Sequence, residues 1–322
     1  MRNLVLICAL ALSAMAMPQA VRVHLPDEVA GVDAIVRTLI SAFDQVDVIA
    51  LGESHGEKRD SDLRIALVRH PDFAKKVRSI VVEFGAIPEQ ETLDRYIQGQ
   101  NITPEQLAQV WKKTSAGRNG VSSPFFADFF TAVRDVDSKL PAAAQIRVFA
   151  GDPGNEKQNR DAVAASLLKE QVLQKHGKAL VVYGAAHFVR TEGDLTGAFN
   201  IGGGIVQRLE VDYPGRTLVV MPIGPSSTAP PSSAGIRDPD YQKFDRALKT
   251  PVRPVLVSFE RLPFREFTAE EFLGQFLLNC RGANGCVSMF KGSTLTLGQM
   301  ADAWVYFGGD SADGENKAKP TR

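Results

Sequence analysis

The sequence predicts an α/β fold, with a mainly parallel sheet flanked by helices. Two observations predict it. Short runs rich in Val, Ile and Leu recur without strict polar alternation, which is typical of strands buried on both faces. Longer segments with helical spacing separate these runs, and strands that alternate with helices favour a parallel sheet. The clearest expected strands are 46–51, 79–84, 146–150, 179–183, 217–221 and 255–259.

Four segments carry helix signals. Residues 32–43 repeat their apolar positions at helical spacing. Thr103 and Thr268 each begin a capping box, in which a hydroxyl and a Gln or Glu three residues later bind the free N–H groups of a helix start. Residues 124–140 carry four phenylalanines on one side. Such a stripe is more often core than the lining of an apolar pocket.

The two ends of the chain are expected to lie outside the folded domain. Residues 1–20 have the parts of a secretory signal peptide, with Arg2 in a short positive start, an apolar run and a small-x-small site at Ala14 to Ala16. We therefore expect a periplasmic or secreted protein. Residues 21–307 are expected to form a single α/β domain, and residues 308–322 a disordered polar tail.

Charge and cysteines narrow the class of protein. The 37 basic residues balance the 37 acidic ones without a basic run, which argues against nucleic acid as the main partner. No stretch after the signal reaches the roughly 18 apolar residues of a membrane span. A small-molecule or peptide substrate is the partner that remains. Cys280 and Cys286 flank a Gly- and Asn-containing turn and predict a disulfide in an exported chain, with two free thiols as the alternative.

Polar residues follow four consecutive expected strands. Glu53 and His55 follow the first, Glu83 ends the second, Asp152 follows the third and His187 follows the fourth. Because ligands of parallel sheets bind at the carboxyl ends of the strands, we predict an active site at this edge. Each residue also has a structural interpretation, and Asp152 could simply stabilise the start of the next helix.

Two imidazoles with nearby carboxylates support two mechanisms, and the sequence leaves both open. In the first, His55 is a general base on water, a carboxylate orients it and His187 polarises the substrate. In the second, His55, His187 and Glu53 bind a divalent metal (Mn, Co or Zn) that activates water. Glu83 would then be a further ligand or the base.

These residues lie in motifs that resemble those of the erythromycin esterase / ChaN-like / TIKI superfamily. The motifs are Gly52-Glu53-Ser54-His55-Gly56, then Val82-Glu83, then Gly184-Ala185-Ala186-His187. Residues 93–99 also resemble the helix after the Glu strand in the erythromycin esterases, and the similarity covers roughly residues 46–190. Erythromycin esterases have one more residue between the first Glu and His, so the spacing here is nearer to the ChaN and TIKI pattern.

The resemblance implies that Glu53, His55, Glu83 and His187 occupy site positions. Members of the superfamily include metal-independent esterases, metal-dependent proteases and haem-binding proteins. Our leading hypothesis is an exported hydrolase that cleaves an ester, amide or peptide bond. The alternative is a haem- or cofactor-binding protein without hydrolytic activity, in which His55 or Tyr183 ligates iron. A third possibility is a scaffold with no activity.

Overall fold

The structure is a computed structural model. It describes residues 23–54, 56–120, 122–155, 157–190, 194–195, 199–200, 203–223, 241–273, 278–280, 286–288 and 292–308. The expected signal peptide, the expected tail from residue 309 onward and His55 lie outside the described residues.

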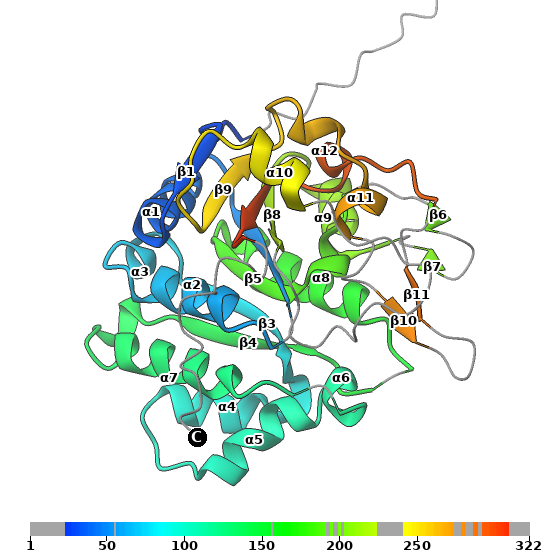
Figure 1. Ribbon diagram of the computed structural model, residues 1–322. Helices are drawn as coiled ribbons and strands as arrows, with labels where there is room; N and C mark the ends of the chain where they lie inside the picture. Colours follow the sequence, from blue (N-terminus) through cyan, green and yellow to red (C-terminus); the bar gives the residue numbers. More distant parts are fainter. Residues whose placement is uncertain are drawn as a thin grey trace, which may run out of the picture.

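An eight-stranded sheet forms the centre of the molecule, in the order β1-β9-β12-β8-β2-β5-β3-β4 (Figure 1). All neighbouring pairs from β12 to β4 are parallel, whereas β9 runs antiparallel to both β12 and β1. The predicted α/β fold with a mainly parallel sheet is therefore confirmed. The strands are β1 (Glu28–Ala30), β2 (Val48–Glu53), β3 (Ser79–Ala86), β4 (Arg147–Asp152), β5 (Ala179–Gly184), β8 (Thr217–Ile223), β9 (Val255–Ser258) and β12 (Ala303–Tyr306).

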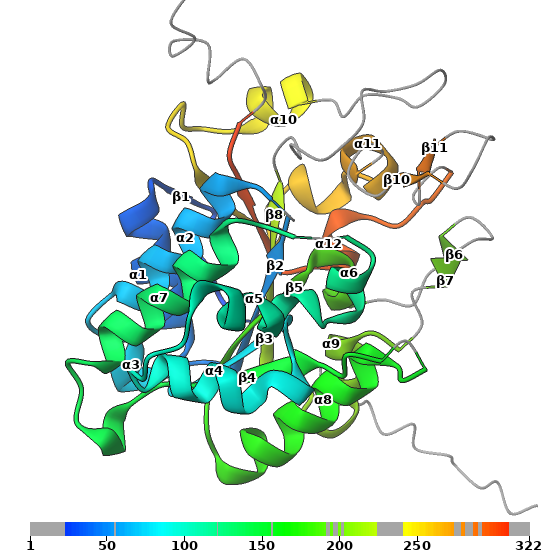
Figure 2. The same cartoon turned by 90° about the horizontal axis from the view of Figure 1, so that it is seen from below.

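Helices cover both faces of the sheet (Figures 1 and 2). One face packs against α1 (Val32–Ala42), α2 (Lys58–Arg69), α3 (Phe73–Lys76), α4 (Gln90–Ile97), α5 (Pro104–Lys112) and α7 (Phe125–Asp137). The other packs against α8 (Arg160–Gln171), α9 (Ile205–Asp212), α10 (Tyr241–Ala247) and α12 (Leu297–Met300). The chain steps from β2 through β3 to β4 in one direction and then returns to β5 and β8. Right-handed crossovers therefore place the outgoing and returning helices on opposite faces.

The expected helix signals are present. Thr103 accepts a hydrogen bond from the Gln106 backbone N–H and donates its own N–H to the Gln106 side chain, which completes the capping box of α5. Thr268 and Glu271 make the same reciprocal pair at the start of α11 (Ala269–Leu273). The phenylalanine stripe of α7 is core, since Phe126 stacks on Phe84 with ring centroids 4.4 Å apart.

Short hairpins lie outside the main sheet. In one of them, β10 (Leu278–Cys280) pairs antiparallel with β11 (Cys286–Ser288), and Cys280 lies opposite Cys286. Opposed residues of an antiparallel pair have Cα atoms about 4.5–5.5 Å apart, a separation that a disulfide can bridge. The disulfide itself stays a prediction. The second hairpin joins β6 (Asp194–Leu195) to β7 (Phe199–Asn200). Among the described helices, none has the length and apolar character of a membrane span.

Candidate functional site

The described residues of the predicted set, which leaves out His55, lie toward or just after the carboxyl ends of four neighbouring strands. Glu53 ends β2 and is opposite Gly184, which ends β5. Glu83 lies in the last part of β3, and Asp152 ends β4. Because β5 lies between β2 and β3, the structure brings all of these residues to one edge of the sheet.

Glu53 and Glu83 are directed toward opposite faces of that edge. Side chains alternate along a strand, so residues two apart share a face. Leu51, two residues before Glu53, belongs to the core beneath α2. Val81, two residues before Glu83, belongs to the core beneath α8. Two charged clusters result. The α2 cluster contains Glu53, Asp60 and Arg64, and the α8 cluster contains Glu83, Asp152, Arg160, Asp161 and His187.

The α2 cluster is almost completely buried. Arg64 Nη1 donates to Asp60 Oδ2 at 2.6 Å, and Arg64 Nη2 lies 3.8 Å from Glu53 Oε1. The Ser54 backbone N–H also donates to Asp60 Oδ2, at 2.9 Å. Burial, with a contribution from Glu53, raises the pKa of Asp60 to about 6 against the opposing effects of Arg64 and Ser54. The cluster thus fastens the first turns of α2 to the end of β2.

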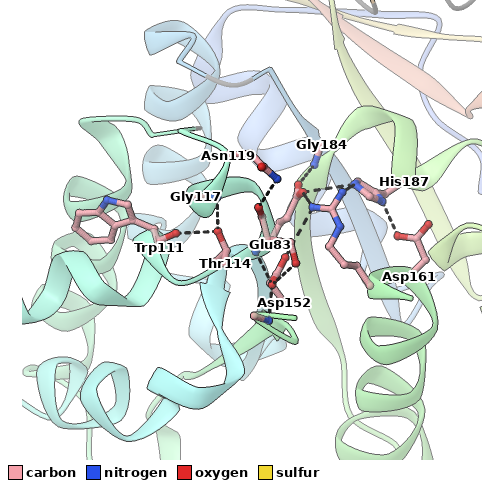
Figure 3. Close-up of polar contacts among 12 residues, drawn as sticks. Glu83, Trp111, Thr114, Gly117, Asn119, Asp152, Asp161, Gly184 and His187 are labelled. Atoms are coloured by element: carbon pink, nitrogen blue, oxygen red, sulfur yellow. Dashed lines mark hydrogen bonds and ion pairs between the residues drawn. The ribbon is translucent and has the colours of Figure 1, made fainter. Parts of the chain in front are cut away.

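Glu83 is the buried carboxylate at the centre of the α8 cluster (Figure 3). Its Oε1 accepts a hydrogen bond from Arg160 Nη1 at 2.8 Å. Its Oε2 accepts one from the Gly184 backbone N–H at 2.7 Å. These contacts join β3 to the end of β5 and to the first turn of α8. Glu83 is therefore held in place on both of its oxygens.

Asp152 is a second buried carboxylate, fixed by backbone and hydroxyl donors. Its Oδ1 accepts from the Ser115 N–H at 2.9 Å, the Ser115 hydroxyl at 3.1 Å and the Gly154 N–H at 2.6 Å. Its Oδ2 lies 3.7 Å from Arg160 Nη1. Asp152 therefore does more than cap a following helix, because it ties α6 (Ser115–Arg118) to the site and shares Arg160 with Glu83.

His187 lies in the 3₁₀ turn Ala185–Phe188 after β5, with a carboxylate on each side of its ring (Figure 3). Nδ1 is 2.5 Å from Asp161 Oδ1, and Nε2 is 3.4 Å from Glu83 Oε1. Burial lowers the pKa of His187, but the Glu83 charge and the Asp161 hydrogen bond outweigh it and raise that pKa to about 10. The ring is therefore an imidazolium at neutral pH, with a proton on both nitrogens.

Arg160 Nη2 lies 3.4 Å from His187 Nε2. This distance also fits a hydrogen bond accepted by a neutral ring, which would contradict the raised pKa. We favour the charged form, because the ring lies between two carboxylates and a single long contact from Arg160 does not offset both. Arg160 and His187 are thus two cations that share Glu83.

The cluster opens to solvent at Arg160, Asp161 and His187. Their side chains are 29%, 22% and 17% exposed, whereas Glu83 and Asp152 are buried. A ligand that approaches this edge therefore meets these three residues before the two buried carboxylates. Sequence reasoning missed Arg160 and Asp161. Their only signal is the start of a helix after Asn159, whose side chain caps α8 through the Ala162 N–H at 3.0 Å.

Haem ligation at this site stays a prediction, because His55, one of its two candidate ligands, lies outside the described residues. Tyr183, the alternative haem ligand, is completely buried in the core beneath α8. Burial, with the charges of Glu83, Asp152 and Asp161, raises its pKa well above the usual value, which opposes the phenolate that iron requires. Tyr183 is therefore a core residue in the described structure, and its role as a haem ligand stays a prediction.

The metal mechanism also gains no support. The described part of the chain holds no group of three or more His, Cys, Asp or Glu side chains arranged to bind a metal ion. Of the tentative ligands, Glu53 lies in the α2 cluster and His187 in the α8 cluster. His55 lies outside the described residues.

A family model described as haem-binding uptake, Tiki superfamily, ChaN matches residues 39–145. The match contains Glu53, His55 and Glu83 and ends before Asp152, Arg160 and His187. It confirms the superfamily resemblance over that third of the chain. No curated protein matches the sequence.

Solved structures share the fold. A Bacillus cereus protein aligns with a TM-score of 0.55 and 12% identity, over 87% of this chain and 92% of its own. A succinoglycan biosynthesis protein aligns with a TM-score of 0.52 and 11% identity, over 85% and 90%. A variant of erythromycin esterase EreC in its open conformation aligns with a TM-score of 0.49 and 12% identity, over 86% and 93%. At these identities the likeness to the Bacillus cereus protein and the succinoglycan biosynthesis protein concerns the fold alone.

Proposed function

We propose that the protein hydrolyses an ester, amide or peptide bond, and that the His187 imidazolium binds the carbonyl oxygen of the substrate. One observation carries the proposal, namely a partly exposed imidazole held between Asp161 and Glu83 with its pKa raised to about 10. A fixed positive charge beside a carbonyl stabilises the oxyanion that develops during hydrolysis.

Arg160 supplies a second donor at the same point. Its Nη2 atom and His187 Nε2 are 3.4 Å apart, so one oxygen can lie at hydrogen-bond distance from both. The Nε2 proton is only loosely engaged by Glu83, at 3.4 Å, whereas Nδ1 is held firmly by Asp161. Asp161 therefore fixes the ring, and Nε2 is left to bind substrate together with Arg160.

Water must be activated by another group, because a protonated His187 cannot accept a proton. We assign this role to His55, which follows β2, the strand beside β5. The Asp60 side chain fixes the Ser54 N–H directly before it. This corresponds to the metal-free mechanism, with His55 as general base and His187 as the polarising group. The signal-peptide pattern supports action in the periplasm or outside the cell.

The proposal is tested with p-nitrophenyl esters and chromogenic amide and peptide substrates. His55→Gln and His187→Gln should each lower kcat/KM by about 10²–10⁴-fold. His187→Gln should also lower the melting temperature, because it removes the cation between Asp161 and Glu83, so rates are compared at a temperature at which both proteins are folded. His24→Gln is the matched control, since its side chain is 86% exposed and lies outside both clusters. It should retain the wild-type rate.

The pH profile gives an independent check. The rate should rise with pH as the general base loses its proton and should fall near pH 10 as His187 loses its own. The absence of hydrolysis of every substrate class, or wild-type rates in both histidine variants, would contradict the proposal.

A further inference from the structure

We propose that Tyr183 is a positioning residue that sets the place of the His187 imidazole through its ring, and that Gly151 provides the space which fixes this ring. The catalytic consequence rests on the proposed function. The geometric claim does not, and it can be tested without any substrate.

The aromatic ring of Tyr183 lies against the imidazole. The two ring centroids are 5.6 Å apart and the planes meet at 77°, an edge-to-face arrangement. Phe188 packs near the same tyrosine, with centroids 6.2 Å apart. Tyr183 is completely buried, so its ring has little freedom to turn. It therefore restricts the imidazole on the side that faces the tyrosine ring.

Gly151 determines where the far end of the Tyr183 ring lies. A Cβ atom on Gly151 would be 2.0 Å from the Tyr183 hydroxyl oxygen and 2.9 Å from Cζ. It would also be 3.0 Å from the Val82 carbonyl oxygen, which is backbone. Gly151 is not among the residues with positive φ, so space and not conformation requires glycine here. The hydroxyl end of the ring fills the position that any side chain would occupy.

The hydroxyl itself has no hydrogen-bond partner among the described residues. It is buried away from solvent, and the neighbouring carboxylates keep it protonated. A hydroxyl that acted on substrate would need to reach the exposed side of the cluster, where Arg160 and His187 lie. We therefore attribute the role of Tyr183 to the shape of its ring.

Displacement of the ring should change the titration of His187. The pKa of this histidine depends on close approach to Glu83 and Asp161, and an opposite charge within about 4–6 Å shifts a pKa by about 1–3 pH units. A shift of the imidazole away from either carboxylate lowers its pKa. The pKa of His187 therefore reports how close its imidazole lies to Glu83 and Asp161.

The experiment is an NMR titration of histidine-labelled full-length protein, with the His187 signal assigned through His187→Gln. Gly151→Ala should lower the His187 pKa by about one pH unit or more, because its Cβ displaces the tyrosine ring. Tyr183→Phe should keep the raised pKa. The double variant Gly151→Ala/Tyr183→Phe should recover part of the loss, because the oxygen at 2.0 Å is gone.

Gly298→Ala is the matched control. Its Cβ would meet Arg265 at 2.7 Å, outside both clusters, so it should lower the melting temperature and leave the His187 pKa unchanged. Should Gly151→Ala not fold, Tyr183→Leu replaces the ring without adding a clash and should lower the same pKa. An unchanged His187 pKa in folded Gly151→Ala and in Tyr183→Leu, or its loss in Tyr183→Phe, would overturn the proposal. Lack of hydrolysis by the wild type would overturn the proposed function and not this inference.

Discussion

The α2 cluster and the α8 cluster are built from the same kinds of side chain at the same edge of the sheet. Each contains an arginine between carboxylates, supplied by a strand end and the first turns of a helix. The α2 cluster is sealed, whereas the α8 cluster exposes its arginine and contains an imidazolium. The difference separates a buried brace, the α2 cluster, from a partly exposed cluster that we propose binds a ligand. Solvent access and a histidine distinguish the two.

The same substitution in each cluster, Arg64→Met and Arg160→Met, tests whether the two clusters differ in their contribution to stability. Arg64→Met should lower the free energy of unfolding by about 3–5 kcal/mol, because it leaves Asp60 and Glu53 buried without their cation. Arg160→Met should cost less than Arg64→Met, because the Arg160 side chain is partly exposed and the His187 imidazolium remains beside Glu83. Denaturant unfolding measures both. Equal losses would show that the two clusters do not differ in kind.

The two clusters should also differ in the pH range over which they contribute to stability. The pKa of Asp60 is raised from 3.8 to about 6 in the folded state, so its contribution is present below pH 3.8 and is lost as the pH rises to about 6. The pKa of His187 is raised from 6.5 to about 10, so its contribution is present below pH 6.5 and is lost as the pH rises to about 10.

Unfolding at a series of pH values should show each loss in its own range. Asp60→Asn should reduce the pH dependence of the free energy of unfolding between pH 3.8 and about 6. The reduction is partial, because burial also raises the pKa of Asp137 to about 6. His187→Gln should reduce the pH dependence between pH 6.5 and about 10 and leave that at acidic pH unchanged. A single variant that changed both ranges would mean that the two clusters titrate together.

The smallest expected effect concerns Asp161. Asp161→Asn keeps the shape of the side chain but removes one of the two negative charges beside His187. The pKa of His187 should fall by about one pH unit, equivalent to about 1.4 kcal/mol. NMR titration of the ring measures it, with Asp62→Asn on the exposed face of α2 as the control. A His187 pKa that stayed near 10 would mean that Glu83 alone holds the charge.

The sheet could be predicted from the sequence because its central strands are continuous apolar runs. The two strands that were missed, β1 and β12, are short. β1 spans three half-buried residues at the sheet edge, and β12 is recognisable only as an aromatic run followed by Gly308. β1 contains too few apolar residues to stand out, whereas β12 and Phe307 form a continuous apolar run that the sequence analysis missed.

The candidate site could be predicted only in part. The strand-end position of Glu83, Asp152 and His187 follows from parallel pairing alone. Arg160 and Asp161 belong to it because α8 packs on the face toward which Glu83 points, and no local pattern carries that information. The assignment of Glu53 and Glu83 to different faces likewise depends on strand order and on the hand of the crossovers.

The position of β5 between β2 and β3 in the sheet has a consequence for the order in which the strands can pair during folding. β2 pairs only with β5 and β8 among the described strands, and β3 pairs with β4 and β5. Residues 39–145 contain β2 and β3, which are not neighbours, and end before β4 begins. A segment that ends at residue 145 therefore contains no two neighbouring strands of the main sheet among those described. Its apolar strands remain unpaired until later strands are available, β4 for β3 and β5 for β2. The segment that is most recognisable in sequence cannot build its own sheet.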